Sequence, residues 1–308
     1  MCVRAHVIGG HFLAAVAALS LAAPARGQRP ATTADAAPLQ PAALAAVVAT
    51  LAYDTAMPLD ARVLGVARRA ASTREKIVFT GWRGRVPGFL ALPQGGARPL
   101  PVVLLSHPGG MSKDFWWQRG GGGALTDSLL ASGFAVLALD AQGNGERTAG
   151  GDYLPLITLF SERRWLRRFR DLSAESAVDY RRALDYLATR PEIDMARVGI
   201  LGYSMGGVIA TLVAATDERI RAAVLCAAAL PDSLVHPFRP IDVAPALARP
   251  SVLVLAGETD EVIPMADTRR FFAAVPSAAK RLISYPSGHE LPPEYSFDAL
   301  AWLREHLR

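Results

Sequence analysis

The chain has 308 residues, of which 51% are hydrophobic and 20% charged, and its formal net charge is +5. This length fits one α/β domain of ordinary size. No basic face interleaved with aromatic residues stands out, so we expect no nucleic-acid partner.

The first 27 residues are typical of a secretory signal peptide. One basic residue, Arg4, precedes an apolar run from Val7 to Ala23, and small residues suited to cleavage follow. Because the run is short for a membrane span, we expect a secreted or periplasmic protein without stable membrane insertion. An uncleaved N-terminal anchor is the alternative. Cleavage at this point would remove Cys2 and leave Cys226 alone, so no internal disulfide is predicted.

The remaining chain is predicted to have two parts. Residues 28–74 are expected to form an N-terminal tail and one or two helices (42–71), and residues 75–308 a catalytic domain. Strand-like and helical segments alternate in the second part, which indicates a mostly parallel, twisted eight-stranded sheet with helices on both faces. The predicted strands are 76–80, 86–92, 102–107, 134–139, 198–203, 222–228, 251–256 and 281–285.

Two small insertions near 150–172 and 229–249 are expected to shape a substrate pocket. The first contains five arginines between positions 163 and 170. These arginines favour either an anionic substrate or, more simply, a solvated helix face. A helix with one apolar stripe is predicted after this insertion, over residues 173–189.

A strand that ends at Gly-x-Ser-x-Gly is the most informative motif in the chain. The apolar run 198–203 leads into Ser204, which Gly202 and Gly206 flank, and helix-forming residues 208–215 follow. Glycines permit a tight strand-to-helix turn, and the amide groups that begin the helix point at charge developing beside the serine. The pattern predicts a nucleophile elbow, and its alternative is a Gly-rich turn with an ordinary exposed serine.

A serine hydroxyl is a weak nucleophile until a base takes its proton. Among the six histidines, His289 is the candidate base, because it lies in a loop between the strand 281–285 and the last helix. Its alternative is a surface loop histidine. Asp260, in the loop after the strand 251–256, is the predicted acid that orients His289. Glu258 is the second choice, and a solvated acidic turn is the alternative for both.

The predicted oxyanion hole needs two backbone N–H donors. Met205, directly after the serine, should supply one. Gly109 should supply the other from the loop 107–110, with Gly110 as its alternative, because glycines let the backbone approach a substrate closely. His107 in the same loop is expected to hold the turn rather than act as a base.

Several of these segments together resemble the α/β-hydrolase superfamily, in its dienelactone hydrolase, acetyl xylan esterase and prolyl-oligopeptidase-like branch. The segment Glu75–Pro93 resembles the leading β-hairpin of this branch, Ser106–Gly110 its oxyanion loop, and Asp140–Arg147 the turn after its fourth strand. The loop reads His107-Pro108 where the branch commonly has His-Gly. The positions that match the triad of the branch are Ser204, Asp260 and His289.

The resemblance implies an α/β-hydrolase fold and a serine esterase that cleaves a small or medium ester through an acyl-enzyme. A peptidase or other acyl hydrolase of the same fold is the first alternative, and a non-catalytic binding protein is the second. No His/Cys/Asp cluster suggests a metal, and no phosphate loop is present, so neither a metal nor a cofactor is expected. The partner predicted is a small-molecule ester.

Overall fold

The computed structural model describes residues 37–148 and 165–308. The predicted signal peptide (1–27) and most of the predicted insertion at 150–172 lie outside these residues. In the part that is described, no helix is long and apolar enough to cross a membrane.

Within the described residues, nine strands form one mixed sheet in the order β1-β2-β3-β5-β4-β6-β7-β8-β9. The pairings from β5 to β9 are all parallel, whereas β1, β2, β3 and β5 pair antiparallel. The strands are β1 (Arg62–Arg68), β2 (Ser72–Gly81), β3 (Gly84–Pro93), β4 (Leu100–Ser106), β5 (Ala135–Leu139), β6 (Ile193–Tyr203), β7 (Ile220–Cys226), β8 (Ser251–Gly257) and β9 (Lys280–Tyr285).

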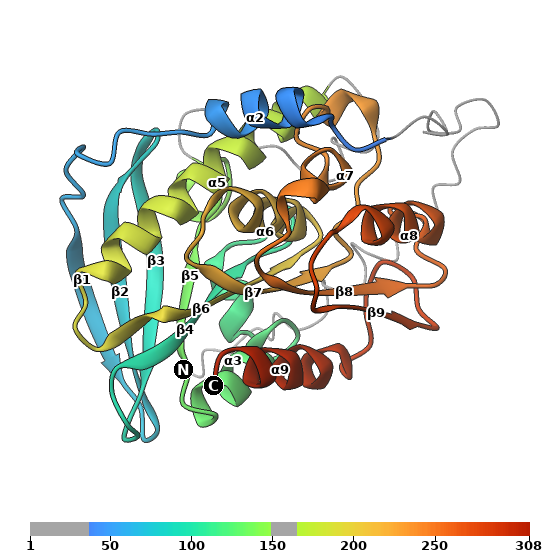
Figure 1. The fold of residues 1–308 in the computed structure, drawn as a ribbon. Helices are drawn as coiled ribbons and strands as arrows, with labels where there is room; N and C mark the ends of the chain where they lie inside the picture. Colours follow the sequence, from blue (N-terminus) through green and yellow to red (C-terminus); the bar gives the residue numbers. More distant parts are fainter. Residues whose placement is uncertain (1–36, 149–164) are drawn as a thin grey trace, which may run out of the picture. The chain divides into compact units, whose positions relative to one another are not determined.

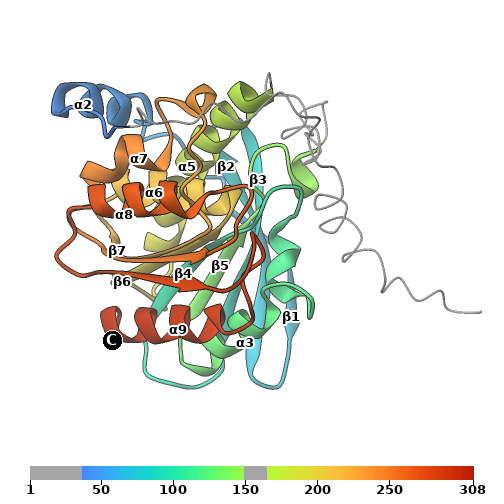
Figure 2. The same ribbon diagram turned by 90° about the vertical axis from the view of Figure 1, so that its right-hand side faces the viewer.

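Helices cover the sheet on both faces. In Figures 1 and 2, α2, α5, α6, α7 and α8 lie on one face, and α3 and α9 lie on the other. The helices are α2 (Pro41–Thr50), α3 (Gly123–Ala131), α5 (Leu166–Ala188), α6 (Met205–Thr216), α7 (Pro240–Val243), α8 (Met265–Ala274) and α9 (Tyr295–His306). Short 3-10 turns are η1 (Lys113–Trp117), η2 (Gly145–Arg147), η4 (Ser233–Val235) and η5 (Ala244–Ala246).

The central strands are continuous apolar runs because both of their faces are covered. Every residue of β4 and β5 is buried, as expected for strands between two helical layers. The core accordingly has two apolar clusters, one on each face of the sheet. The prediction of a mostly parallel α/β sheet covered by helices is confirmed.

Two details of the prediction were wrong. Of the predicted helical region 42–71, only Pro41–Thr50 is helical, and Arg62–Arg68 forms β1, which raises the number of strands from eight to nine. Every residue of β1 is exposed, so backbone pairing with β2 at the sheet edge, rather than burial of one face, stabilises this strand. A strand held in this way lacks the alternation of apolar and polar residues that predicts strands.

The helix α5 begins at Leu166, earlier than the predicted start at residue 173. Phe169 and Leu172 are buried and extend the apolar stripe of the helix toward its N-terminus. The second insertion, 229–249, folds into η4, α7 and η5.

Candidate active site

Ser204 lies at the turn between β6 and α6 in a backbone conformation that side chains rarely adopt. Its φ is 54° and its ψ is −116°, and this strain is typical of a nucleophile elbow. The turn is held on both sides. The Ser204 N–H donates to the carbonyl of Cys226 on β7 at 2.9 Å, and its carbonyl accepts from the N–H groups of Gly207 and Val208.

The two glycines of the motif are required by close backbone contacts. A β-carbon at Gly202 would collide with the carbonyl of Gly206, and one at Gly206 would collide with the carbonyls of Ser106 and His107. The second contact exists because β4 and β6 are parallel neighbours, with Ser106 opposite Gly202. The loop after β4 therefore lies directly beside the elbow.

Ser204, His289 and Asp260 form one hydrogen-bonded chain. The Oγ of Ser204 lies 2.8 Å from Nε2 of His289, and Nδ1 of His289 lies 2.8 Å from Oδ2 of Asp260. Because a carboxylate only accepts, Nδ1 carries the proton and donates to Asp260. Nε2 is then the lone-pair nitrogen that accepts from the serine hydroxyl.

The chain of three groups runs from the interior toward solvent. The Asp260 side chain is 1% exposed and that of His289 is 27% exposed, and Ser204 is also partly exposed. The other carboxylate oxygen of Asp260, Oδ1, accepts from the N–H groups of Val262 and Ile263, each at 2.8 Å. Hydrogen bonds to both oxygens thus fix the orientation of the Asp260 carboxylate, with Oδ2 directed at the imidazole of His289.

The structure distinguishes Asp260 from Glu258, the second choice for the acid. The exposed carboxylate of Glu258 accepts a hydrogen bond from Ser284 Oγ at 2.9 Å, and it takes no part in the contact with His289. The loops that carry the acid and the histidine are joined through their backbones. Glu258 donates to Tyr285, and Thr259 donates to Ser287.

The predicted oxyanion donors lie on the two segments that meet at the elbow. Met205 is the first residue of α6, where the amide groups of a helix point outward with the positive end of its dipole. The N–H of Gly110 is already engaged, since it donates to Oδ1 of Asn144 at 3.2 Å. Of the two glycines considered, Gly109 is therefore the better candidate for the second donor.

His107 holds the loop, as expected from its position. Its buried ring donates from Nδ1 to the carbonyl of Pro108 at 2.9 Å and accepts at Nε2 from the N–H of Ala141 at 3.1 Å. Burial lowers the pKa of this imidazole below its ordinary value of 6.5, and the ring has no nitrogen left for a substrate.

A buried ion pair beside this loop was not foreseen as part of the site. Asp140 accepts from the backbone N–H and from Nζ of Lys113, both at 2.8 Å, and from the N–H of Glu146 at 2.9 Å. Lys113 also binds Glu146 at 2.6 Å. The pair fixes the segment that follows the oxyanion loop against the turn after β5. Two features of the sequence could have indicated this ion pair. Lys113 lies three residues after the second of two glycines, and Asp140 directly follows a buried strand.

A cavity of about 290 Å³ opens beside Gly110. The described residues that line it are uncharged: Gly110, Met111, Ser112, Phe115, Gln118, Gly145 and Thr148. Across residues 37–148 and 165–308, no group of three or more His, Cys, Asp or Glu side chains is arranged to hold a metal ion.

The chain belongs to the alpha/beta hydrolase family, whose sequence model matches residues 102–306. Among curated proteins, it is similar to "Putative hydrolase YtaP" of Bacillus subtilis (strain 168), with 28% identity over 178 residues. That match covers 55% of this chain and 58% of the relative. The chain thus spans about half the length of the curated relatives it matches.

Solved structures share the fold at low sequence identity. Acetyl Xylan Esterase 1 from Thermoanaerobacterium sp. JW/SL YS485 has a TM-score of 0.68 at 20% identity, over 87% of this chain and 94% of that one. A cold-adapted esterase from an Arctic intertidal metagenomic library has a TM-score of 0.65 at 22% identity, over 80% of this chain and all of that one. At these identities the similarity establishes the fold alone.

Proposed function

We propose that this protein is a serine esterase that cleaves a small or medium ester through an acyl-enzyme. The observation that carries the proposal is the hydrogen-bonded chain from Ser204 Oγ through His289 to Asp260, with 2.8 Å at each contact. This order of groups, in which a third residue holds the base that activates the serine, is the arrangement of a Ser-His-Asp triad.

The proposed reaction begins with attack of Ser204 Oγ on the ester carbonyl carbon while His289 Nε2 takes the hydroxyl proton. Asp260 stabilises the imidazolium that forms, without taking the proton itself. The N–H groups of Met205 and Gly109 donate to the oxyanion of the tetrahedral intermediate. The C–O bond to the alcohol then breaks, and His289 delivers its proton to the leaving alcohol.

Water completes the cycle by the same steps. His289 takes a proton from water as the water attacks the acyl carbon, and Ser204 leaves with that proton restored. Every proton in the two halves passes through Nε2, so neither a metal nor a cofactor is needed.

One observation favours an ester over an amide as the substrate. The solved structures with this fold described above are esterases by name.

A series of chromogenic esters of increasing acyl length, tested beside acetylated sugars and a matched anilide, examines the proposal. We expect turnover of at least one ester and little turnover of the anilide. Ser204→Ala should abolish turnover while its circular dichroism spectrum stays that of the wild type. Preferential cleavage of the anilide would favour a peptidase. Absence of turnover by the folded wild type on every compound would favour a non-catalytic binding protein.

A further inference from the structure

Tyr203, the residue directly before Ser204, ties the loop of His289 to the strand of the nucleophile. Its hydroxyl donates to the backbone carbonyl of His289 at 2.9 Å and accepts from the N–H of Leu291 at 2.7 Å. One phenol oxygen therefore bridges the backbone on both sides of Glu290. Tyr203 is also the last residue of β6, so the residue that forms this bridge is joined directly to Ser204 by a peptide bond.

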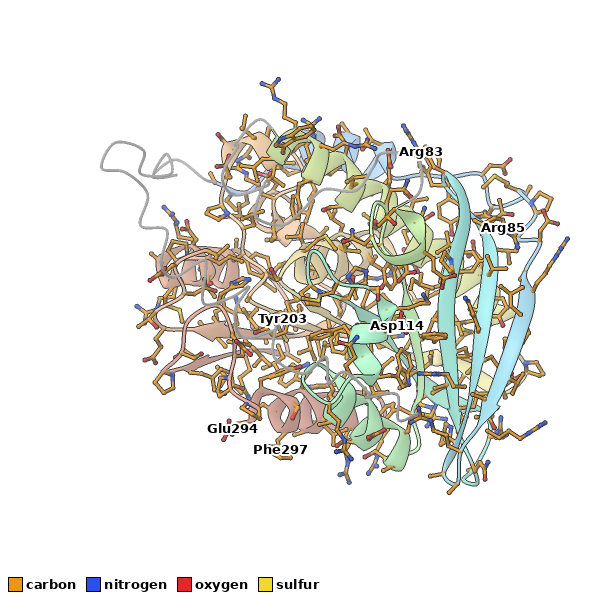
Figure 3. All side chains as sticks on the ribbon, turned by 180° about the vertical axis from the view of Figure 1, so that it is seen from behind. Arg83, Arg85, Asp114, Tyr203, Glu294 and Phe297 are labelled. Carbon is orange, nitrogen blue, oxygen red and sulfur yellow. The ribbon has the colours of Figure 1, made fainter. Side chains whose placement is uncertain are left out.

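The ring of Tyr203 is held as firmly as its hydroxyl. It packs edge-on against the ring of His289, with centroids 6.4 Å apart, and against the ring of Tyr295, with centroids 5.7 Å apart. Figure 3 shows Tyr203 inside the molecule, whereas Glu294 and Phe297 lie at its outer edge near α9. Burial raises the pKa of the Tyr203 hydroxyl well above its ordinary value of 10, so at neutral pH it keeps its proton and its role as donor.

The two sides of the histidine loop are fastened by different means. Before His289, backbone bonds join the loop to the acid loop, through Thr259 to Ser287 and Glu258 to Tyr285. After His289, the carbonyl of residue 289 and the N–H of residue 291 both bond to the hydroxyl of Tyr203. The side that faces α9 thus depends on a side chain, and that side chain belongs to the nucleophile's own strand.

We propose that Tyr203 is a positioning residue, which sets the distance from His289 Nε2 to Ser204 Oγ by clamping the histidine loop to the end of β6. This inference rests on the proposed function, because it assigns Tyr203 a part in proton transfer between the two groups. Without the hydroxyl, both hydrogen bonds that join the backbone of residues 289 and 291 to β6 are lost, whereas the ring packing and the contact between His289 and Ser204 remain. A misplacement of about 1 Å between reacting groups lowers a rate by as much as 100-fold.

The test is Tyr203→Phe, which keeps the ring and removes the hydroxyl. We expect kcat on the best ester to fall about 10- to 100-fold while KM stays within about twofold, because the clamp acts on proton transfer rather than on substrate binding. The rate at which a fluorophosphonate probe labels Ser204 should fall by the same factor. Both rates are expressed per folded molecule, with the folded fraction measured by near-UV circular dichroism.

Two matched variants separate positioning from general destabilisation. Tyr295→Phe removes a phenol hydroxyl from the same cluster, and this hydroxyl forms no hydrogen bond with any of the described residues. Tyr285→Phe removes a hydrogen bond of 2.6 Å to Asp298 on α9 without touching the residues on either side of Glu290. We expect kcat within about twofold of the wild type for both.

Unchanged kcat and labelling rate in Tyr203→Phe would overturn the proposal. An equal loss in Tyr285→Phe, or a rise in KM at constant kcat, would also overturn it, because either result assigns Tyr203 a structural or binding role. Failure of the wild type itself to turn over esters or to be labelled at Ser204 would refute the proposed function instead, and the two failures are therefore distinguishable.

Discussion

His289 Nε2 lies 2.8 Å from Ser204 Oγ, although 85 residues separate the two in the chain. The contact follows from the sheet, because β6 and β9 are both parallel strands whose carboxyl ends face the same edge. Loops that leave parallel strands at one edge converge there, and ligands commonly bind where they do. The fold thus brings the proposed base and the proposed nucleophile together at one edge of the sheet.

Asp260→Asn should lower kcat by about four orders of magnitude with little change in KM. An amide presents a donor as well as an acceptor to Nδ1, so it no longer fixes the tautomer in which Nε2 accepts the serine proton. Glu258→Gln is the matched control and should keep kcat within about twofold, since Glu258 bonds to Ser284. Steady-state kinetics on both variants decides the matter. If activity fell strongly in Glu258→Gln and not in Asp260→Asn, Glu258 rather than Asp260 would be the acid that orients His289.

Gly206→Ala should damage both stability and activity. The added methyl group would overlap the carbonyls of Ser106 and His107, so the elbow and the oxyanion loop must separate. We expect a loss of about 2 kcal/mol in the free energy of unfolding in urea and a fall in kcat of about 100-fold or more. Gly120→Ala is the control, because no atom lies within 4 Å of its added β-carbon. Equal behaviour of the two variants would contradict the packing described for the elbow.

Lys113→Met should be among the most destabilising single substitutions in the site. Lys113 and Asp140 are both buried, with 2.8 Å between Nζ and Oδ2, and replacement of the lysine leaves a buried carboxylate without its positive partner. We expect a loss of about 3–5 kcal/mol in the free energy of unfolding. The double variant with Asp140→Asn should lose less than the sum of the two single variants.

The exposed ion pair between Arg249 and Glu218 provides the comparison for the buried one. Its loss in Arg249→Ala should cost less than about 1 kcal/mol. Chemical denaturation of the four variants at one pH measures these differences. A cost for Lys113→Met as small as that for Arg249→Ala would show that the buried pair is not what holds the segment after the oxyanion loop.

The stability of the protein should fall as the pH drops below about 6.5, and His107 should contribute to this fall. The pKa of its buried imidazole is lowered in the folded state, whereas the unfolded chain takes up a proton near the ordinary value. The unfolded state therefore binds more protons between these two values, and acid favours it. The contribution is up to about 1.4 kcal/mol per pH unit.

His107→Asn isolates this contribution, because an amide does not titrate in this range. Urea denaturation of both proteins between pH 5 and 8 should give a steeper loss of stability in the wild type on the acidic side. Parallel curves for the two proteins would contradict the assignment of a buried, neutral imidazole.

Motifs with strong local signals could be predicted from the sequence. The glycines around Ser204 indicate the turn because only glycine fits there, and the apolar runs of β4 to β8 indicate strands buried on both faces. The position of Asp260 could also be predicted, since its loop follows a recognisable strand.

Contacts made by backbone atoms of distant residues could not be predicted. The partners of the Tyr203 hydroxyl are backbone atoms 86 and 88 residues away, and nothing in the local sequence marks a tyrosine for such a role. The same holds for Asn144, which holds the N–H of Gly110 and so distinguishes between two glycines that look alike in sequence. The strand β1 was missed because pairing at a sheet edge places few demands on the types of residue.

Labelling by a fluorophosphonate probe tests the central claim most directly, because such probes phosphonylate a serine only when a neighbouring base activates it. The folded wild type should be labelled on the peptide that contains Ser204, as located by mass spectrometry. Labelling should be lost in Ser204→Ala and strongly slowed in His289→Ala. A wild type that stays unlabelled while folded, or labelling that proceeds unchanged in His289→Ala, would contradict the account.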